Sequence, residues 1–470
     1  MAMVVQHNMQ AMNSNRMLGS TTGAQAKSTE KLSSGFKINR AADDAAGLTI
    51  SEKMRKQIKG LDRASTNAQD GVSAVQTAEG ALTEVHSMLQ RMNELAVQAA
   101  NGTNSKSDRD AIQAEIEQLT TEVDRVAETT KFNETYLLKG DGTQAAKTIN
   151  LAAHDAGLKG TLVDNGDGTA TFTMDKLDAA DSVTIGGRSF TIGAAAASAT
   201  ALAKAGAGKA SAGVAWAPGD KVKVNNVEYT YVSTASMAAG WYAGKPVSGE
   251  GKADAALFKA GANVEAGTKK FHVIDADANG VDKNDATVIT AAHAYDLAKA
   301  ELTTANGIGD TKGHATVTNT NNKFTIQTGQ ADVASALSFN LHVGSDADMT
   351  NKINVNVETM TSDYLGIKGL NVSDDSGNAA TYAIDAIADA VSKVSAQRSA
   401  LGAIQNRLEH TIANLDNISE NTTAAESRIR DTDMASEMVT YSKNNILAQA
   451  GQSMLAQANQ STQGVLSLLR

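Results

Sequence analysis

The 470-residue sequence has no cysteine, only two prolines, and few aromatic residues, which make up 4% of the chain. The absence of cysteine excludes disulfide bonds, thiolate metal sites and cysteine nucleophiles. Proteins ordinarily contain about 5% proline, roughly 23 residues at this length, so the scarcity of proline favours long uninterrupted helices. With few aromatic side chains, the cores must be built from Ala, Leu, Val, Ile and Met.

The chain also has an excess of negative charge and no long apolar run. There are 42 Lys and Arg against 52 Asp and Glu, which gives a formal net charge of −10. We expect no nucleic-acid partner, because phosphate binding needs clustered Lys and Arg. No stretch of about 18 apolar residues occurs, so we also expect no membrane insertion. The first residues lack a basic segment followed by an apolar one, which predicts no cleavable signal peptide.

Composition divides the chain into two arms and an insert. Residues 1–140 and about 353–470 contain neither proline nor tryptophan, whereas Trp216, Pro218, Trp241 and Pro246 all lie between them. The middle is rich in Gly, Thr, Asn and Asp. We therefore predict an α+β multidomain fold in which long α-helical coiled-coil arms from both termini carry an inserted, mainly β, hairpin-rich region.

Apolar residues recur every seven positions in both arms, which is the spacing of helices that pack along one face. One such helix should run from about residue 62 to 101 and be about 60 Å long at 1.5 Å per residue. A compact helical bundle would show the same periodicity, so that alternative stays open. After a break at residues 101–104, Ser107 and Asp110 have the spacing of a capping box for the next helix. The recurring residues are Val75, Leu82, Leu89, Ala96, Ala78, Val85, Met92 and Ala99 in the first arm and Ile387, Val394, Leu401, Leu408 and Leu415 in the second.

The outermost ends have a weaker pattern. Residues 1–34 carry a loose apolar stripe among many polar residues, and residues 434–470 end in the apolar cluster 465–469. Each reads as an amphipathic helix too polar to be stable alone. Such segments either gain order by packing against something else or remain disordered tails. The apolar cluster favours packing, because it would promote aggregation if left exposed.

The insert contains repeated hairpin patterns. Residues 183–192 alternate around Gly186-Gly187, and residues 222–231 repeat that layout around Asn225-Asn226, both pairs suited to tight two-residue turns. Each hairpin leads into an Ala-rich stretch, which predicts a degenerate ββα unit. We expect further hairpins around residues 165–168 and 320–322, and one helix over residues 291–305.

No constellation typical of an enzyme is present. The eight histidines form no His-x-x-x-His pair, and no Gly-x-Ser-x-Gly elbow occurs. The segment 206–210 resembles a phosphate loop only superficially. The segment Asp275–Gly280 matches the first half of a calcium loop, but position twelve is Ala286, so an ordinary Asx-rich turn is favoured. We therefore predict a protein that is not an enzyme and has no cofactor or metal; an active insert is the alternative.

Four segments point to a known family. Leu32–Ser51 and Leu89–Gln98 closely resemble the N-terminal signature of bacterial flagellin, and Leu401–Glu409 and Ile446–Gln460 resemble its C-terminal one. The resemblance covers nearly all of both arms, whereas the insert shows none that can be used. A hook–filament junction protein of the same superfamily is the structural alternative.

The resemblance implies a subunit that polymerises into the extracellular helical filament of the bacterial flagellum for motility. It implies export through the flagellar type III apparatus, with a flagellar export chaperone, the filament cap and hook–filament junction proteins as further partners. It also implies an inner-core domain from residues 1–43 and 432–470 and an outer-tube domain from 44–141 and 353–431. Residues 142–352 would be the variable, surface-exposed insert, where an adhesin role stays open.

Two sets of site residues follow from the resemblance. The innate immune receptor Toll-like receptor 5 is expected to bind at Gln90, Arg91, Leu95 and Glu115, although these residues could instead serve only subunit contacts and helix surfaces. The assembly contacts are expected to be Val5, Met9, Met12, Met454, Leu455, Val465, Leu466, Leu468, Leu469 and Arg470.

Overall fold

The computed structural model describes residues 8–207, 215–234, 237–243, 257–267, 269–374 and 376–468. The chain forms two compact units. The first comprises Met1–Ala74, Phe339–Val355 and Ala403–Arg470, and the second comprises Val75–Ser338 and Asn356–Gly402. Two long helices, α2 (Ala45–Ala99) and α8 (Asn378–Arg430), contribute to both units.

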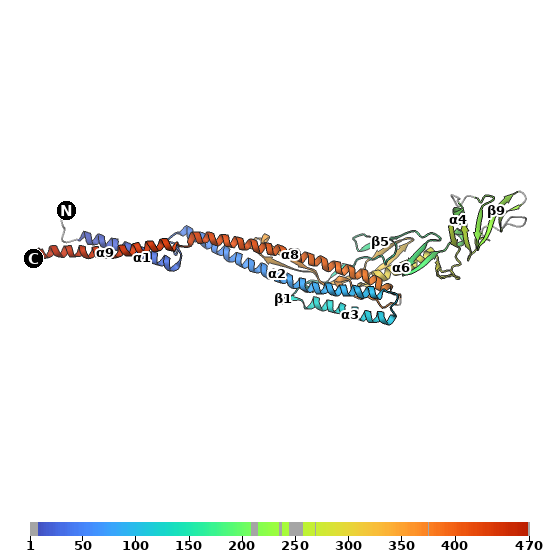
Figure 1. The fold of residues 1–470 in the computed structure, drawn as a ribbon, viewed down its shortest axis with the longest axis horizontal. Helices are drawn as coiled ribbons and strands as arrows, with labels where there is room; N and C mark the ends of the chain where they lie inside the picture. Colours follow the sequence, from blue (N-terminus) through green and yellow to red (C-terminus); the bar gives the residue numbers. More distant parts are fainter. Residues whose placement is uncertain are drawn as a thin grey trace. The chain divides into compact units, whose positions relative to one another are not determined.

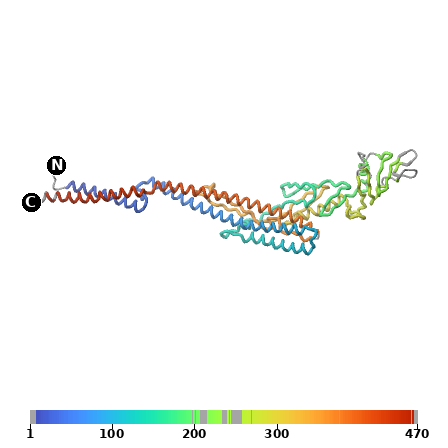
Figure 2. Tube along the Cα trace, in the orientation of Figure 1, coloured from blue at the N-terminus to red at the C-terminus, as the bar shows by residue number. Residues whose placement is uncertain are grey.

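In the first unit, the two terminal helices lie side by side and antiparallel (Figures 1 and 2). Helix α1 (Met9–Ser34) begins at the Asn8 side chain, which accepts a hydrogen bond from the Ala11 amide, and ends at Gly35 with φ of 78°. Helix α9 spans Met434–Leu468. At one end of the pair Asn8 Nδ2 donates to the Ala458 carbonyl at 3.1 Å, and at the other Lys31 Nζ lies 3.9 Å from Glu437. The weak terminal helices predicted from sequence therefore form, and they contact each other.

The core of this unit lies between α2 and α8. Leu408 and Leu415 of α8, with 0% and 5% of their surface exposed, pack in one cluster with Leu61, Ala64 and Ala68 of α2. Around this core, Ser65 Oγ donates to Asp416 Oδ1 at 3.0 Å and Ser419 Oγ to Asp62 Oδ1 at 2.9 Å. The heptad prediction is confirmed here, because Leu408 and Leu415, which are seven residues apart in the predicted seam, are both buried.

A set of contacts, which we call the bracket, joins residues 35–37, Ser51 and Arg55 to residues 426–432 where the terminal helices meet the long ones. Two guanidinium groups stack on the Phe36 ring, Arg55 at 5.2 Å and Arg430 at 4.7 Å from its centroid. The buried Glu426 carboxylate accepts hydrogen bonds from Ser51 Oγ at 2.7 Å and Arg55 Nε at 3.1 Å. The backbone adds two bonds, from the amide of residue 37 to the carbonyl of Arg430 at 2.7 Å and from that of residue 432 to the carbonyl of residue 35 at 2.9 Å.

In the second unit, α2 continues and α3 (Lys106–Thr129) follows it. All eight apolar positions predicted between residues 75 and 99 are buried. The start of α2 lies well before residue 62, because the Asp44 side chain caps it by accepting from the Gly47 amide at 2.8 Å. At 55 residues, α2 is about 80 Å long.

The capping box predicted at Ser107 and Asp110 is wrong by two residues. The structure places it at Ser105 and Asp108, where Ser105 Oγ accepts from the Asp108 amide at 3.3 Å and Asp108 Oδ2 accepts from the Ser105 amide at 3.0 Å. The physical reason is a tight turn. The amide of residue 104 already bonds the carbonyl of residue 101 at 3.1 Å, so the helix can begin immediately afterwards.

The remainder of the second unit is rich in β-strands, as predicted for the insert. An antiparallel four-stranded sheet has the order β14-β15-β5-β4, a five-stranded sheet the order β10-β9-β8-β11-β12, and a three-stranded sheet the order β13-β7-β6 with β13 parallel to β7. The strands of these sheets are β4 (Gly160–Asp164), β5 (Thr169–Met174), β6 (Ser182–Ile185), β7 (Arg188–Ile192), β8 (Lys221–Val224), β9 (Val227–Thr234), β10 (Met237–Ala243), β11 (Asn263–Ala266), β12 (Lys269–His272), β13 (Val288–Ile289), β14 (Thr316–Thr320) and β15 (Lys323–Gln327).

Shorter elements complete both units; β17, η1 and β18 lie mostly in the first unit and the others in the second. Strands β1 and β2 pair with each other, as do β3 with β16 and β17 with β18. The helix predicted at residues 291–305 forms as α6. These elements are β1 (Lys131–Phe132), β2 (Thr135–Tyr136), β3 (Lys147–Asn150), α4 (Ala196–Gly206), α6 (Ala291–Asn306), β16 (Gln330–Val333), β17 (Leu337–His342), η1 (Met349–Asn351), β18 (Lys352–Val357) and α7 (Ser362–Leu365).

The four predicted hairpins are present, and their turns have the required backbone geometry. Gly186 and Gly187 have φ of 55° and 71°, and Asn225 and Asn226 have φ of 49° and 67°. The first hairpin is followed by α4, as the ββα prediction requires. For the second hairpin that prediction is wrong, because β10 follows it and pairs with β9. The aromatic pair at residues 241–242 favours a strand there despite the preceding alanines.

Acidic groups and one histidine gather where α8 begins. His154 Nε2 lies 3.7 Å from Asp389 Oδ2. Burial raises the pKa of the Asp385 carboxyl, and the charges of Asp155 and Asp389 add to the effect while His154 opposes it. The folded chain therefore binds a proton at Asp385 more tightly than the unfolded chain does. This carboxyl favours folding at low pH and opposes it once the pH rises above its folded pKa.

Asp385→Asn should therefore raise the unfolding temperature of the second unit at pH 7. The expected gain is about 1–2 °C, because a half-exposed carboxylate contributes well under ~1 kcal/mol. It should fade as the pH falls toward about 3, where the carboxyl is protonated in both states. Asp108→Asn is the control with the opposite expected sign. Hydrogen bonds from Ser105 lower the pKa of Asp108, so removing this carboxylate should lower the unfolding temperature at pH 7. Calorimetry across this range tests both; an equal gain at every pH would contradict the assignment.

Candidate assembly and receptor-binding surfaces

The expected assembly residues whose side chains the structure describes lie on the surface of the α1–α9 pair. Met9 and Met12 of α1 and Met454 of α9 are exposed, and Leu455 is half-buried. Helix α9 includes Val465, Leu466 and Leu468, whose side chains lie outside the described part of the structure. Val5, Leu469 and Arg470 lie outside the described residues.

The α1–α9 pair buries little of its own apolar surface. Among its described residues, the buried side chains are Ser28 of α1 and Ala448 and Ala458 of α9. The larger apolar side chains remain in contact with solvent. Exposed large apolar side chains that gather on one surface mark an interaction site. The exposed large apolar residues of the two helices are Met9, Met12, Met17, Met434, Met438, Val439, Ile446, Leu447 and Met454.

Sequence reasoning missed the most exposed part of α9. Val439 is 69% and Ile446 is 66% exposed, and they border a shallow groove together with Met438, Leu447 and the polar Lys443. A signal was available, because Val439 and Ile446 are separated by seven residues, as are Leu447 and Met454. This spacing places each pair on one side of a helix. We call Met438, Val439, Ile446 and Leu447 the α9 apolar patch.

Three of the four expected receptor-binding residues form an exposed polar cluster on α2 and α3. The Arg91 guanidinium bonds Glu115 of α3, with Nε 3.0 Å and Nη2 2.9 Å from Oε1, and its Nη1 lies 3.3 Å from Glu94 Oε2. The Arg91 and Glu115 side chains are 51% and 45% exposed. Gln90 is also exposed, and its Nε2 lies 3.0 Å from His86 Nε2. Arg91 therefore joins the two helices through a charge-assisted pair.

Leu95 does not belong to this exposed cluster. It is 2% exposed, so its side chain cannot contact a receptor in this structure. Its position along the helix explains the burial, because Met92 and Ala99, three residues before and four after it, are both buried. In this structure Leu95 therefore has a packing role, and its part in receptor binding stays a prediction.

The weak metal candidate gains no support, and the phosphate-loop-like segment 206–210 lies largely outside the described residues. Asp277 Oδ1 accepts from the Asn279 amide at 2.9 Å and the Val281 amide at 3.0 Å, which is an Asx turn. Lys283 Nζ lies 3.1 Å from Asp275 Oδ1, where a cation ligand would be needed. In the part of the chain that the structure describes, no group of three or more His, Asp or Glu side chains is arranged to hold a metal, and no helix is long and apolar enough to cross a membrane.

Comparisons with known proteins match both arms and the full length. Residues 5–143 match the bacterial flagellin N-terminal helical region, and residues 384–469 match the C-terminal helical region. The flagellin of Clostridium tyrobutyricum is 39% identical over 468 residues, covering 98% of this chain and all of the relative. Flagellin D of Vibrio cholerae serotype O1 is 36% identical and the flagellin of Bacillus subtilis strain 168 is 34% identical, each with complete coverage of both chains.

A solved structure of FliC from Burkholderia pseudomallei is also similar, at 20% identity, with 72% of this chain and 99% of that chain covered and a TM-score of 0.27. Superposition at this level supports no conclusion. The full-length relatives do show the family, because each is more than 30% identical over an alignment that covers at least 98% of this chain. The chain belongs to the bacterial flagellin family, whose members are structural subunits of the flagellar filament used for motility rather than enzymes.

Proposed function

We propose that this chain is built into the extracellular filament through α1 and α9, with the α9 apolar patch as a principal contact between subunits. The observation that carries the proposal is the row of large apolar side chains that the α1–α9 pair leaves exposed. Burying one such side chain contributes about 1.5–3 kcal/mol. Repetition of a contact between different surfaces, which does not close into a ring, generates a helical polymer.

The domain boundaries expected from sequence fit this proposal. Residues 1–43 and 432–470 would form the inner core, residues 44–141 and 353–431 the surrounding tube, and residues 142–352 the outward-facing insert. The weak self-packing of the ends has a benefit before assembly. Ordering such segments costs conformational entropy, and only contacts with neighbouring subunits offset that cost. Association before assembly is therefore disfavoured.

Further partners would use the same surface before or during assembly. An export chaperone would cover the α9 apolar patch until secretion, and the filament cap and hook–filament junction proteins would contact the subunit at the growing and basal ends. An export route that threads an unfolded chain suits a sequence with no cysteine and two prolines.

The experiment that tests filament formation uses the intact chain. Monomers obtained by acid or heat dissociation are moved to assembly conditions with short filament seeds, and growth is followed by electron microscopy. Lengthening of the seeds with time and monomer concentration is the expected result. A folded monomer that leaves seed length unchanged would contradict the proposal.

We propose separately that Toll-like receptor 5 binds the cluster of Gln90, Arg91 and Glu115. The cluster is exposed, and Arg residues held in place by a carboxylate are favoured as interface hot spots because little side-chain entropy is lost on binding. Leu95 would act from beneath by fixing the position of α2.

Arg91→Ala should weaken receptor activation by at least about tenfold, a typical loss for a hot-spot residue. Filament growth should change much less, because the Arg91 guanidinium is exposed and the core beneath it is untouched. Arg125→Ala is the matched control, since Arg125 of α3 is also exposed and pairs with Glu122. A cell-based receptor reporter compares the three proteins at equal monomer concentration. Equal signalling by parent and Arg91→Ala would overturn the assignment.

A further inference from the structure

The solvent face of the five-stranded sheet carries a row of alternating charges. Glu228 on β9 is opposite Lys223 on β8, Lys223 is opposite Glu265 on β11, and Glu265 is opposite Lys270 on β12. Directly opposed residues of neighbouring strands project from the same face. The reverse face packs into an apolar core that contains Val222 and Phe271 and is buried from solvent. The charged row is therefore held on a well-supported surface.

One cation in this row, Lys223, lies between two carboxylates on the neighbouring strands but forms no ion pair with either of them within 4.0 Å. Glu228 Oε1 accepts from Lys221 at 2.7 Å, a bond that lowers the pKa of Glu228, and Glu265 Oε1 lies 3.1 Å from Lys270. Both acidic neighbours of Lys223 are thus engaged elsewhere. Among the described residues, none forms an ion pair with Lys223 within 4.0 Å.

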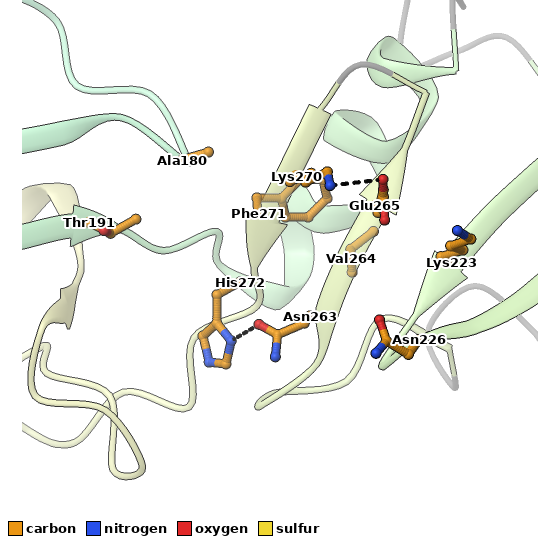
Figure 3. A pocket seen from close by; sticks show the side chains of 10 residues that line it. All are labelled: Ala180, Thr191, Lys223, Asn226, Asn263, Val264, Glu265, Lys270, Phe271 and His272. Atoms are coloured by element: carbon orange, nitrogen blue, oxygen red, sulfur yellow. Dashed lines mark hydrogen bonds and ion pairs between the residues drawn. The ribbon is translucent and has the colours of Figure 1, made fainter.

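Lys223 lines a hollow of about 420 Å³ whose walls carry both polar side chains and the apolar Ala180, Val264 and Phe271 (Figure 3). Asn226 lies beside it at the β8–β9 turn, Asn263 and Glu265 line the β11 side, and Thr191 of β7 forms part of the opposite wall. The volume lies within the range of small-molecule sites, roughly 300–1,000 Å³. A ligand here meets both polar and apolar groups, and the polar ones offer hydrogen bonds and charge.

A buried carboxylate fixes the histidine at the end of the hollow. Asp282 is 3% exposed and accepts from the amides of Asp275 at 2.7 Å and Asn284 at 2.8 Å. His272 Nε2 lies 3.1 Å from the same carboxylate, and its Nδ1 lies 2.7 Å from Asn263 Oδ1 (Figure 3). The ring is therefore held at both nitrogens, and Asn263 keeps its amide nitrogen for other partners. This wall is organised before a ligand arrives.

We propose that this hollow binds a carboxylated saccharide unit, with its carboxylate on Lys223 and its hydroxyls on Asn226, Asn263 and Glu265. An amide side chain can both donate to and accept from sugar hydroxyls, and a carboxylate accepts from them. The unpaired ammonium selects an acidic sugar over a neutral one. The inference is independent of filament assembly, because it concerns the insert alone.

The test uses the full-length monomer and ligand-observed NMR with three probes at equal ionic strength: D-glucuronate, D-glucose and inorganic phosphate. Glucuronate should bind with a dissociation constant of about 1 mM, as one ion pair and a few hydrogen bonds on an open surface allow. Glucose, which lacks the carboxylate, should bind at least about tenfold more weakly. Phosphate should also bind more weakly, because it cannot reach the amides.

Variants of two exposed strand lysines localise the site. Lys223→Gln should weaken glucuronate binding about tenfold, whereas Lys323→Gln on β15, which does not line the hollow, should leave it unchanged. Both substitutions are on an exposed strand surface, and circular dichroism checks that the fold is retained. The proposal is overturned if glucuronate does not bind, if glucose or phosphate binds equally well, or if Lys223→Gln binds like the parent.

Discussion

Val439→Asp should abolish filament growth while the monomer stays folded. Val439 is 69% exposed, so a carboxylate there is solvated in the monomer and the free energy of unfolding should hardly change. In the proposed filament the same position is buried against a neighbouring subunit. Burying an unpaired charge costs several kcal/mol per contact, and the contact repeats in every subunit. Seeded growth of the variant, followed by electron microscopy, measures the effect.

The insert offers a matched control for this substitution. Val163 on β4 is 58% exposed, so Val163→Asp introduces the same charge at a similarly exposed valine. If the insert faces outward as proposed, filaments of this variant should grow at the parental rate. Growth of Val439→Asp at the parental rate would exclude the α9 apolar patch as a subunit contact.

Leu408→Ala should lower the free energy of unfolding of the first unit by about 2–5 kcal/mol. Leu408 is fully buried, and it packs against Ala64 and Ala68, whose short side chains cannot extend into the space left behind. The lost transfer free energy and the cavity therefore both contribute. Denaturant unfolding followed by far-ultraviolet circular dichroism measures the change, since α2 and α8 supply much of the helix.

Ile418→Ala on the same helix is the comparison for that measurement. Ile418 is 37% exposed, so its truncation removes mainly contacts at the surface. The free energy of unfolding should therefore fall by less than about 1 kcal/mol. Similar losses for both variants would show that the predicted seam is not the core of this unit.

The helical arms were largely predictable because the apolar residues that pack in their cores recur every seven positions along the sequence. Every residue of the predicted α8 seam is buried, from Ile387 to Leu415. The ends of the helices were harder, because several polar residues compete to cap them. Ser105 and Ser107 have equal chemistry, and only the turn before them decides which one begins α3.

In the insert, the turns were predictable and the sheet order was not. Asn225 and Gly186 mark tight turns because their residue types tolerate positive φ. The pairing of β5 with β15 joins residues more than 140 positions apart, as in the register of Phe172 with Phe324. Nothing in a local pattern specifies such a partner. Strand β10 was missed for a related reason, since its formation depends on the free edge of β9.

The candidate sites show a similar division. The ion pair of Arg91 with Glu115 links positions that the family resemblance had selected, and the structure brings them together. Burial of Leu95 depends on how α2 packs, which residue type alone does not reveal. Val439 was overlooked because a short apolar stripe among polar residues looks like ordinary helix surface until its partner helix is seen to leave it uncovered.

The bracket around Phe36 has a mechanical consequence. The two backbone bonds there join residues 35–37 to residues 430–432, so the two points at which the chain enters and leaves the terminal pair are tied together. A pull on either terminal helix must shear both bonds and slide Phe36 past Arg55 and Arg430 before the helix can detach. A pull that reaches these residues through either terminal helix is therefore passed to both α2 and α8.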